Sequence, residues 1–230
     1  MKQSNYFQWL KIIMVSTCLI SLPLGLGRAE SKSEHNSDSQ EEIVFLEDFE
    51  PPGDGKPKNT GVGGSRNGLR CDAEEEAIRA LMPQGNFGLT LQENPAIYLY
   101  LPQTSATQVV LAFQDEAGTQ YARAFLPIET VNNIASVALP KDKMSLTPGK
   151  NYQWKISAIC GEYLQPGDPT FTGWVQRVEA TNISKELATK TTKEQISFFG
   201  QHGYWYDLLN AISVFSPDNL LRVLELRSDN

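Results

Sequence analysis

The stretch LTPGKNYQWKISAIC, residues 146–160, is the segment around which the rest of the chain can be organised. Pro148 and Gly149 favour a turn at its start, because proline presets φ and glycine tolerates a positive φ. The second half alternates apolar and polar residues, and alternate side chains of an extended strand point to one face. The pattern therefore predicts a turn and then a core strand, whose buried face consists of Tyr152, Trp154, Ile156, Ala158 and Cys160.

Further strands are predicted on both sides of this segment. Short apolar segments follow one another from Pro95 onward, with turn residues between them and no intervening helical pattern. Such a series is typical of an antiparallel β-sandwich. The spacing L-x-P-G-x-x-Y at residues 146–152 resembles the tyrosine corner of immunoglobulin-like and fibronectin-III-like sandwiches. The chain is thus expected to be mainly β, with strands at residues 96–101, 108–114, 120–126, 134–139, 152–160 and 171–179.

The C-terminal part has a different period. After Glu179 apolar residues recur about every 3.6 positions, as in an amphipathic helix. The run G-x-W-Y-D-x-L at residues 203–209 resembles the middle of a tetratricopeptide hairpin. Only one incomplete copy is present, and such repeats need neighbours to bury their faces. We therefore expect residues 181–230 to form a small helical appendage that packs on a sandwich of residues 71–180.

The first 29 residues have the features of an export signal. A polar start contains Lys2 and Lys11, residues 12–26 are mostly apolar, and Gly27 and Ala29 supply the small residues of a cleavage site. A membrane anchor is the alternative, but about 15 apolar residues are fewer than the roughly 20 that span a bilayer. A lipoprotein signal at Cys18 is disfavoured because the apolar run continues past it. The sequence predicts export to the periplasm or the extracellular space, without membrane attachment after cleavage.

Residues 30–70 are rich in Ser, Glu, Asp, Gly, Pro and Lys, which predicts a disordered, low-complexity tail. The glycine-rich run at residues 61–68 lacks the Gly-Lys-Ser/Thr ending of a phosphate-binding loop. The whole chain has a net charge of −7. Cleavage after Ala29 would remove three basic residues and no acidic ones, giving −10. This acidic balance argues against a nucleic-acid partner.

Signal cleavage would leave two cysteines, Cys71 and Cys160. An even number of cysteines in an exported chain indicates a disulfide, although two free buried thiols are the alternative. A bridge that closes a loop of this length stabilises the folded state by about 4 to 5 kcal/mol on the chain-entropy estimate.

Several segments together resemble a family of exported, uncharacterised cyanobacterial proteins known as domain of unknown function 928. The resemblance spans about residues 71–207, and its most specific part is the motif GWVQRV at 173–178, which follows a Tyr-x-Trp strand and a Cys. It implies export and the architecture described above, and it supplies no reaction. The other matching segments are Gly88-Leu89-Thr90, Pro95, Leu101-Pro102, Gln114-Asp115, Tyr152, Trp154, Cys160 and Trp205-Tyr206-Asp207.

The sequence offers little material for catalysis. Only two histidines are present, His35 and His202, so a histidine triad or a multi-histidine zinc site cannot be assembled. We predict no catalytic residue, cofactor or metal. A glycosidase would need a pair of carboxylates across a cleft. The acids nearest the last two predicted strands, Glu162, Asp168 and Glu179, show no spacing that fixes such a pair.

The residues that we single out form a candidate binding or tail-docking surface. Trp174 and Arg177 differ in parity, so they lie on opposite faces of their strand. Contact with the helical tail is the expected role of the aromatic residues Tyr98, Tyr100 and Trp174, and an aromatic platform for a sugar is the alternative. Arg177 is expected to pair with an acid such as Asp207 and so to anchor the tail.

These observations lead to one expected function and two alternatives. The expected function is a non-catalytic interaction module of the cell envelope or the extracellular space, with a protein or an envelope polysaccharide as its partner. The first alternative is a carbohydrate-binding domain, and the second is a glycoside hydrolase.

Overall fold

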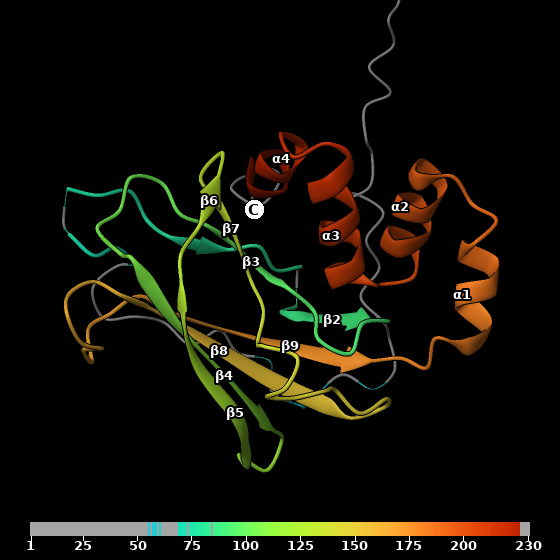
Figure 1. The fold of residues 1–230 in the computed structure, drawn as a ribbon, viewed down its shortest axis with the longest axis horizontal. Helices are drawn as coiled ribbons and strands as arrows, with labels where there is room; N and C mark the ends of the chain where they lie inside the picture. Colours follow the sequence, from blue (N-terminus) through green and yellow to red (C-terminus); the bar gives the residue numbers. More distant parts are fainter. Residues whose placement is uncertain are drawn as a thin grey trace, which may run out of the picture. The chain divides into compact units, whose positions relative to one another are not determined.

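The computed structural model describes residues 69–72, 74–83 and 85–225, together with Gly55, Pro57, Lys58 and Thr60. The predicted export signal and most of the predicted tail lie outside the described residues. The described residues all belong to one compact unit, residues 42–230. Within them the chain is mainly β, with nine strands in two sheets and four helices (Figure 1).

The larger sheet has five strands in the order β2-β9-β8-β4-β5. β2 pairs with β9 in parallel, whereas the other neighbours are antiparallel. The expectation of a wholly antiparallel sandwich was therefore wrong at this edge. The five strands are β2 (Phe87–Thr90), β9 (Thr170–Arg177), β8 (Asn151–Ile159), β4 (Gln108–Asp115) and β5 (Gln120–Pro127).

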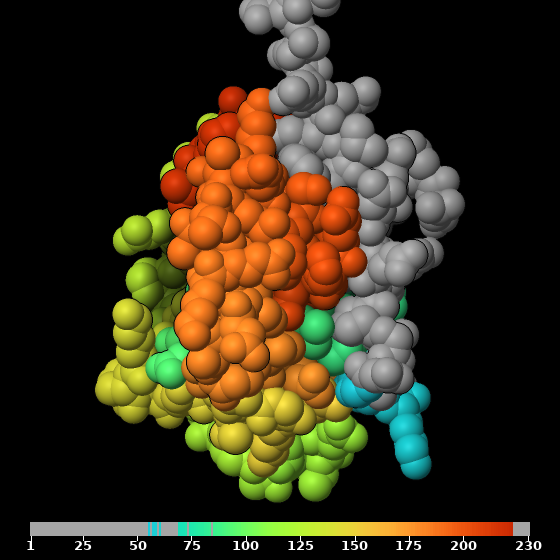
Figure 2. All heavy atoms as spheres, turned by 90° about the vertical axis from the view of Figure 1, so that its right-hand side faces the viewer, coloured from blue at the N-terminus to red at the C-terminus, as the bar shows by residue number. Residues whose placement is uncertain are grey.

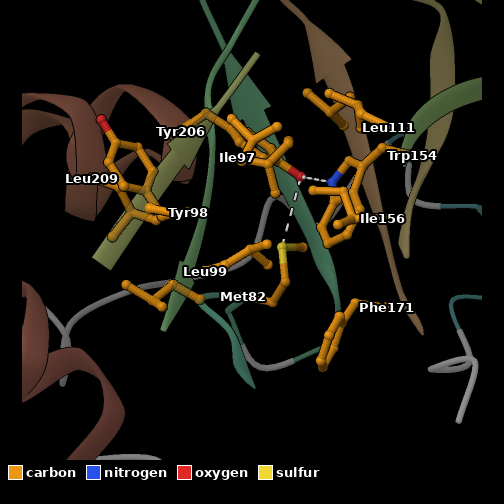
Figure 3. Packing of buried hydrophobic residues seen from close by; sticks show 14 of the residues in the cluster. Met82, Ile97, Tyr98, Leu99, Leu111, Trp154, Ile156, Phe171, Tyr206 and Leu209 are labelled. Atoms are coloured by element: carbon orange, nitrogen blue, oxygen red, sulfur yellow. Dashed lines mark hydrogen bonds between the residues drawn. The ribbon is translucent and has the colours of Figure 1, made fainter. Parts of the chain in front are cut away.

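The smaller sheet has four antiparallel strands in the order β1-β3-β7-β6. These strands are β1 (Arg79–Ala80), β3 (Ile97–Tyr100), β7 (Ile134–Val137) and β6 (Thr130–Val131). The alternating apolar residues of both sheets form one core, because a strand presents every second side chain to the same face. Figure 3 shows part of this core, including Ile97, Leu99, Leu111, Trp154, Ile156 and Phe171.

Four helices follow the last strand: α1 (Thr181–Leu187), α2 (Thr192–Gln201), α3 (Trp205–Phe215) and α4 (Asn219–Glu225). α2 begins with a capping box, in which the Thr191 side chain accepts from the Glu194 amide and the Glu194 carboxylate accepts from the Thr191 amide. α1 buries no residue, and Figure 2 shows α1 and α2 forming the surface at this end of the molecule. α3 is the helix that buries a broad apolar face.

α3 packs beside β2 at the edge of the sandwich (Figure 1). Its buried apolar face includes Leu208, Leu209 and Ile212, which are at most 2% exposed. Gly88 in β2 permits this contact, since a Cβ built there would lie 2.6 Å from the Cβ of Trp205. The C-terminal helices are thus joined to the sandwich by a close backbone approach.

The turn before β8 contains the expected tyrosine contact. Gly149 has a φ of 75°, which a glycine adopts without steric cost. The hydroxyl of Tyr152 accepts a hydrogen bond of 3.4 Å from the amide of Thr147. The side chain therefore ties the start of β8 to the turn that precedes it.

A disulfide joins Cys71 to Cys160, with the two Cα atoms 5.2 Å apart. Cys160 directly follows β8, and Cys71 precedes β1. The bridge thereby fastens the segment that leads into the smaller sheet to a central strand of the larger sheet.

Candidate functional site

The hydroxyl of Tyr206 is the polar centre of the contact between α3 and the sandwich. It accepts a hydrogen bond of 2.7 Å from the indole nitrogen of Trp154 (Figure 3). It donates one of 2.9 Å to the carbonyl of Trp174. Tyr206 is 1% exposed, so water does not satisfy these groups. Burial raises the pKa of the Tyr206 hydroxyl far above its usual value, and it stays protonated. These hydrogen bonds hold α3 against the larger sheet.

Asp207 forms a second polar contact of α3. Its carboxylate accepts a 2.9 Å hydrogen bond from the amide of Leu91 and one of 3.3 Å from the side chain of Gln92, at the end of β2. Desolvation raises the pKa of Asp207 to about 6, although these hydrogen bonds act in the opposite direction. Asp207 thus holds α3 against the segment that follows β2, through a backbone amide and a side-chain amide.

Arg177 pairs with an acid, but this acid is Glu93 and not Asp207, which we had named as an example. Its guanidinium donates to the carbonyl of Leu146 and forms an ion pair of 3.0 Å with Glu93. The reason is that Arg177 lies at the end of β9 nearest the turn before β8, where Leu146 and Glu93 are joined by a backbone hydrogen bond. Arg177 therefore stabilises the turn before β8.

The three aromatic residues considered as the alternative sugar platform do not share an exposed surface. Tyr98 is 3% exposed, and its hydroxyl contacts Ser213 of α3 at 3.0 Å. Trp174 is 6% exposed. Tyr100 has a different neighbour. The guanidinium carbon of Arg79 lies 5.0 Å from the centroid of its ring. Tyr98 belongs to the helix-docking surface, and a sugar platform of these three side chains is wrong.

Trp174 belongs to the outer face of the five-stranded sheet, which we define as the face turned away from the smaller sheet. Phe87 is its neighbour across the β2–β9 pair, and both are buried outside the main core. Residues of the predicted tail reach this face. The carbonyl of Gly55 accepts from the Asn151 side chain at 2.7 Å, and Pro57 is buried. This end of the outer face is therefore closed.

The other end of the outer face is open and hollowed. A depression of about 290 Å³, which we call the hollow, lies over β4, β5 and β8. Leu164 of the loop between β8 and β9 also lines it. Small side chains make the depression, since Ala112 lies between Arg123 of β5 and Lys155 of β8 in one cross-strand row. The remaining lining residues are Val110, Phe113, Gln114, Gln120 and Ser157.

Exposed aromatic side chains lie close to this hollow in the fold. Phe125 is 59% exposed and is the cross-strand neighbour of Val110. Tyr163 is 73% exposed and directly precedes Leu164. Large exposed apolar side chains around a depression are a common feature of interaction sites. This open part of the outer face is the candidate functional surface.

Two of the three acids considered for glycoside hydrolysis, Asp168 and Glu179, have structural contacts. Asp168 is buried, and its carboxylate accepts a 2.8 Å hydrogen bond from the amide of Gln165 in the loop before β9. Glu179 accepts from the side chain of Thr181. Among the described residues, no three carboxylate, imidazole or thiol groups gather closely enough to hold a metal ion. The described helices include none with the length and apolar character of a bilayer span.

A family model described as Domain of Unknown Function (DUF928) matches residues 61–219. The chain belongs to this DUF928 family. No curated protein matches the chain. The DUF928 match includes both cysteines of the disulfide, all nine strands and the whole of α3. The helix that packs on the sandwich, α3, is therefore part of the DUF928 domain.

Sequence reasoning did not identify the hollow of the DUF928 domain. Its residues come from β4, β5 and the later strand β8, and only the cross-strand register brings Arg123 and Lys155 into one row. One sequence feature could have indicated it. Two of the outward positions of the strand at residues 108–115 are small or polar, namely Ala112 and Gln114.

Proposed function

We propose that this protein is an exported, non-catalytic interaction module of the cell envelope or the extracellular space, and that it contacts its partner through the open part of its outer sheet face. The partner is a protein or an envelope polysaccharide. Export is supported by the N-terminal sequence, and a disulfide suits an oxidising compartment.

The body of this module is an immunoglobulin-like sandwich. In that architecture one sheet has the order A-B-E-D, and variable-type domains extend the other to C′-C-F-G. The order β1-β3-β7-β6 corresponds to the first, and β5-β4-β8-β9 corresponds to the second. The contact of Tyr152 with Thr147 at the start of β8 supports this assignment, because a tyrosine corner marks the start of strand F.

One observation carries the functional proposal: the two ends of the same sheet face differ in exposure. Trp174 and Phe87 are buried at one end, whereas Phe125 is 59% and Tyr163 73% exposed at the other. Burying both of these exposed rings in a complex would remove apolar surface from water, at about 25 cal/mol per Å². The exposed end is thus the part of the sheet that gains most from a partner.

A co-sedimentation assay of purified protein with envelope fragments tests the proposal. The double variant Phe125→Ser/Tyr163→Ser should lose most of the binding while keeping the wild-type unfolding temperature. Val214→Ser is the matched control, because Val214 is 80% exposed on α3, and it should bind normally. Equal binding by all three proteins would rule out the outer face as the contact surface.

Export is tested separately by N-terminal sequencing of the protein recovered outside the cytoplasm. Cleavage after Ala29 gives a chain that begins at Glu30. Recovery of the protein only in the cytoplasm would refute the export proposal.

A further inference from the structure

The row formed by Arg123, Ala112 and Lys155 has the chemistry of an anion site. Neighbouring strands are about 4.8 Å apart, so the Cα atoms of Arg123 and Lys155 are separated by about 10 Å. Ala112 lies between them and fills little of that gap. Both side chains are exposed and long enough to meet above the alanine. A single negatively charged group seated there could interact with both cations.

Neither cation has a carboxylate partner among the described residues. The described ion pairs involve Lys150, Arg177 and Lys190 instead. The guanidinium of Arg123 lies 5.4 Å from the ring centroid of Phe125, a cation–π contact that holds it beside the hollow. Two basic side chains thus lie side by side in a chain in which 27 acidic residues outnumber 20 basic ones.

Uncharged polar groups continue the hollow on one side. The side chain of Gln114 donates a 2.6 Å hydrogen bond to that of Gln153, and this bond fixes both amides on the outer face. An amide has two donors and two acceptor sites, so each retains capacity for a ligand. Ser157 lies on the other side and exchanges a 2.9 Å hydrogen bond with Thr170. Fixed amides suit a ligand that carries several hydroxyl groups.

We propose that this hollow binds an acidic polysaccharide through the carboxylate of a uronic acid residue, with Arg123 and Lys155 on the carboxylate and Gln114 and Gln153 on the hydroxyls. This inference rests on the proposed function and names its ligand class. The exposed rings of Phe125 and Tyr163 supply apolar faces on which sugar rings stack. β5 is the edge strand, so an extended chain can run across the hollow and leave the sheet.

A saccharide fits these residues better than an acidic peptide. Peptide sites obtain most of their affinity from deep, desolvated pockets for a few apolar anchors. The hollow has a volume of about 290 Å³. Amide, hydroxyl and cationic side chains line it, together with the apolar residues Val110, Ala112, Phe113 and Leu164. Small-molecule sites begin at about 300 Å³, so the hollow has the size of a subsite rather than of a deep cleft.

Calorimetric titration of the purified protein with polygalacturonate tests the inference. The wild-type protein should bind it, and it should bind the fully methyl-esterified polymer at least about tenfold more weakly, because esterification removes the charge from the same backbone. Arg123→Gln and Lys155→Gln should each weaken binding at least about fivefold. Ala112→Leu, which fills the floor without changing charge, should also weaken it.

Lys143→Gln is the matched control, since Lys143 is an exposed lysine outside the hollow, and it should bind as the wild type does. Equal loss in this control, equal affinity for the esterified polymer, or stronger binding of poly-glutamate would each overturn the inference. Absence of polygalacturonate binding would overturn it too. In that case the co-sedimentation assay separates the two proposals. If binding to envelope fragments still depends on Phe125 and Tyr163, the interaction surface is retained and only the proposed ligand class is wrong.

Discussion

The indole nitrogen of Trp154 in β8 donates a 2.7 Å hydrogen bond to the hydroxyl of Tyr206 in α3. Trp154 is fully buried and Tyr206 is 1% exposed. The bond joins a residue of the central strand of the larger sheet to the helix, so the helix completes the core.

Tyr206→Phe should lower the free energy of unfolding by about 3 kcal/mol. The change leaves the Trp154 N–H and the Trp174 carbonyl buried without this partner, and each such group costs about 1 to 3 kcal/mol. Tyr204→Phe is the control, because Tyr204 is also buried and its hydroxyl has no hydrogen-bond partner among the described residues. Urea denaturation measures both, and equal losses would contradict the role of the Tyr206 hydroxyl.

Gly173→Ala should destabilise the fold by about 3 kcal/mol. A Cβ at this position would lie 2.3 Å from Cζ2 of Trp154, so the ring or the strand must move. Gly161→Ala is the control, since no atom lies within 4 Å of a Cβ there, and the change should be within about 0.5 kcal/mol of wild type. Similar thermal midpoints for the two variants would show that Trp154 does not pack against Gly173.

The carboxyl of Asp207 predicts a pH dependence of stability. Its pKa is about 6 in the folded protein against 3.8 for an unperturbed aspartate, so between these values the folded state holds the extra proton. The contribution of this group to the free energy of unfolding therefore falls as pH rises from about 4 to 6, by about 3 kcal/mol. Below pH 4 the contribution is fully present, and above pH 6 it is lost.

Urea titrations of the wild type and Asp207→Asn at several pH values between 4 and 7 isolate this contribution. The stability of the wild type relative to the variant should decline over that range. Parallel curves would mean that the pKa of Asp207 is not raised in the folded state.

Removal of the bridge in Cys71→Ser/Cys160→Ser should cost about 4 to 5 kcal/mol, because the disulfide spans 89 positions and restricts the unfolded chain. Guanidinium denaturation of the oxidised wild type and the variant gives the difference. A reducing agent should bring the wild type down to the variant and leave the variant unchanged. An oxidised wild type no more stable than the variant would show that the bridge does not stabilise the fold.

The strands with clear alternation were predictable from sequence. The predicted strand at 152–160 is β8 at Asn151–Ile159, and the predicted strand at 120–126 is β5 at Gln120–Pro127. β2 was missed because three of its four residues are buried, so no period of two is visible. Its place in the sheet depends on α3, which approaches through Gly88.

The candidate surface was less predictable than the fold. The parity of Trp174 and Arg177 was read correctly, since alternation is local, and they lie on opposite faces of β9. The acid named for Arg177 was wrong because such a pair depends on a contact between distant segments, here Arg177 with Glu93. The exposure of Phe125 likewise depends on the edge position of β5, which only the strand order reveals.

The most direct test of the proposed contact surface places a photoreactive benzoylphenylalanine at position 125 or at position 214 of the protein in intact cells. Both native residues are exposed, at 59% for Phe125 and 80% for Val214, so both positions accept the probe. Crosslinked products at position 125 and none at position 214 are the predicted result. Products at position 214 with none at position 125 would contradict binding through the outer face of the sheet.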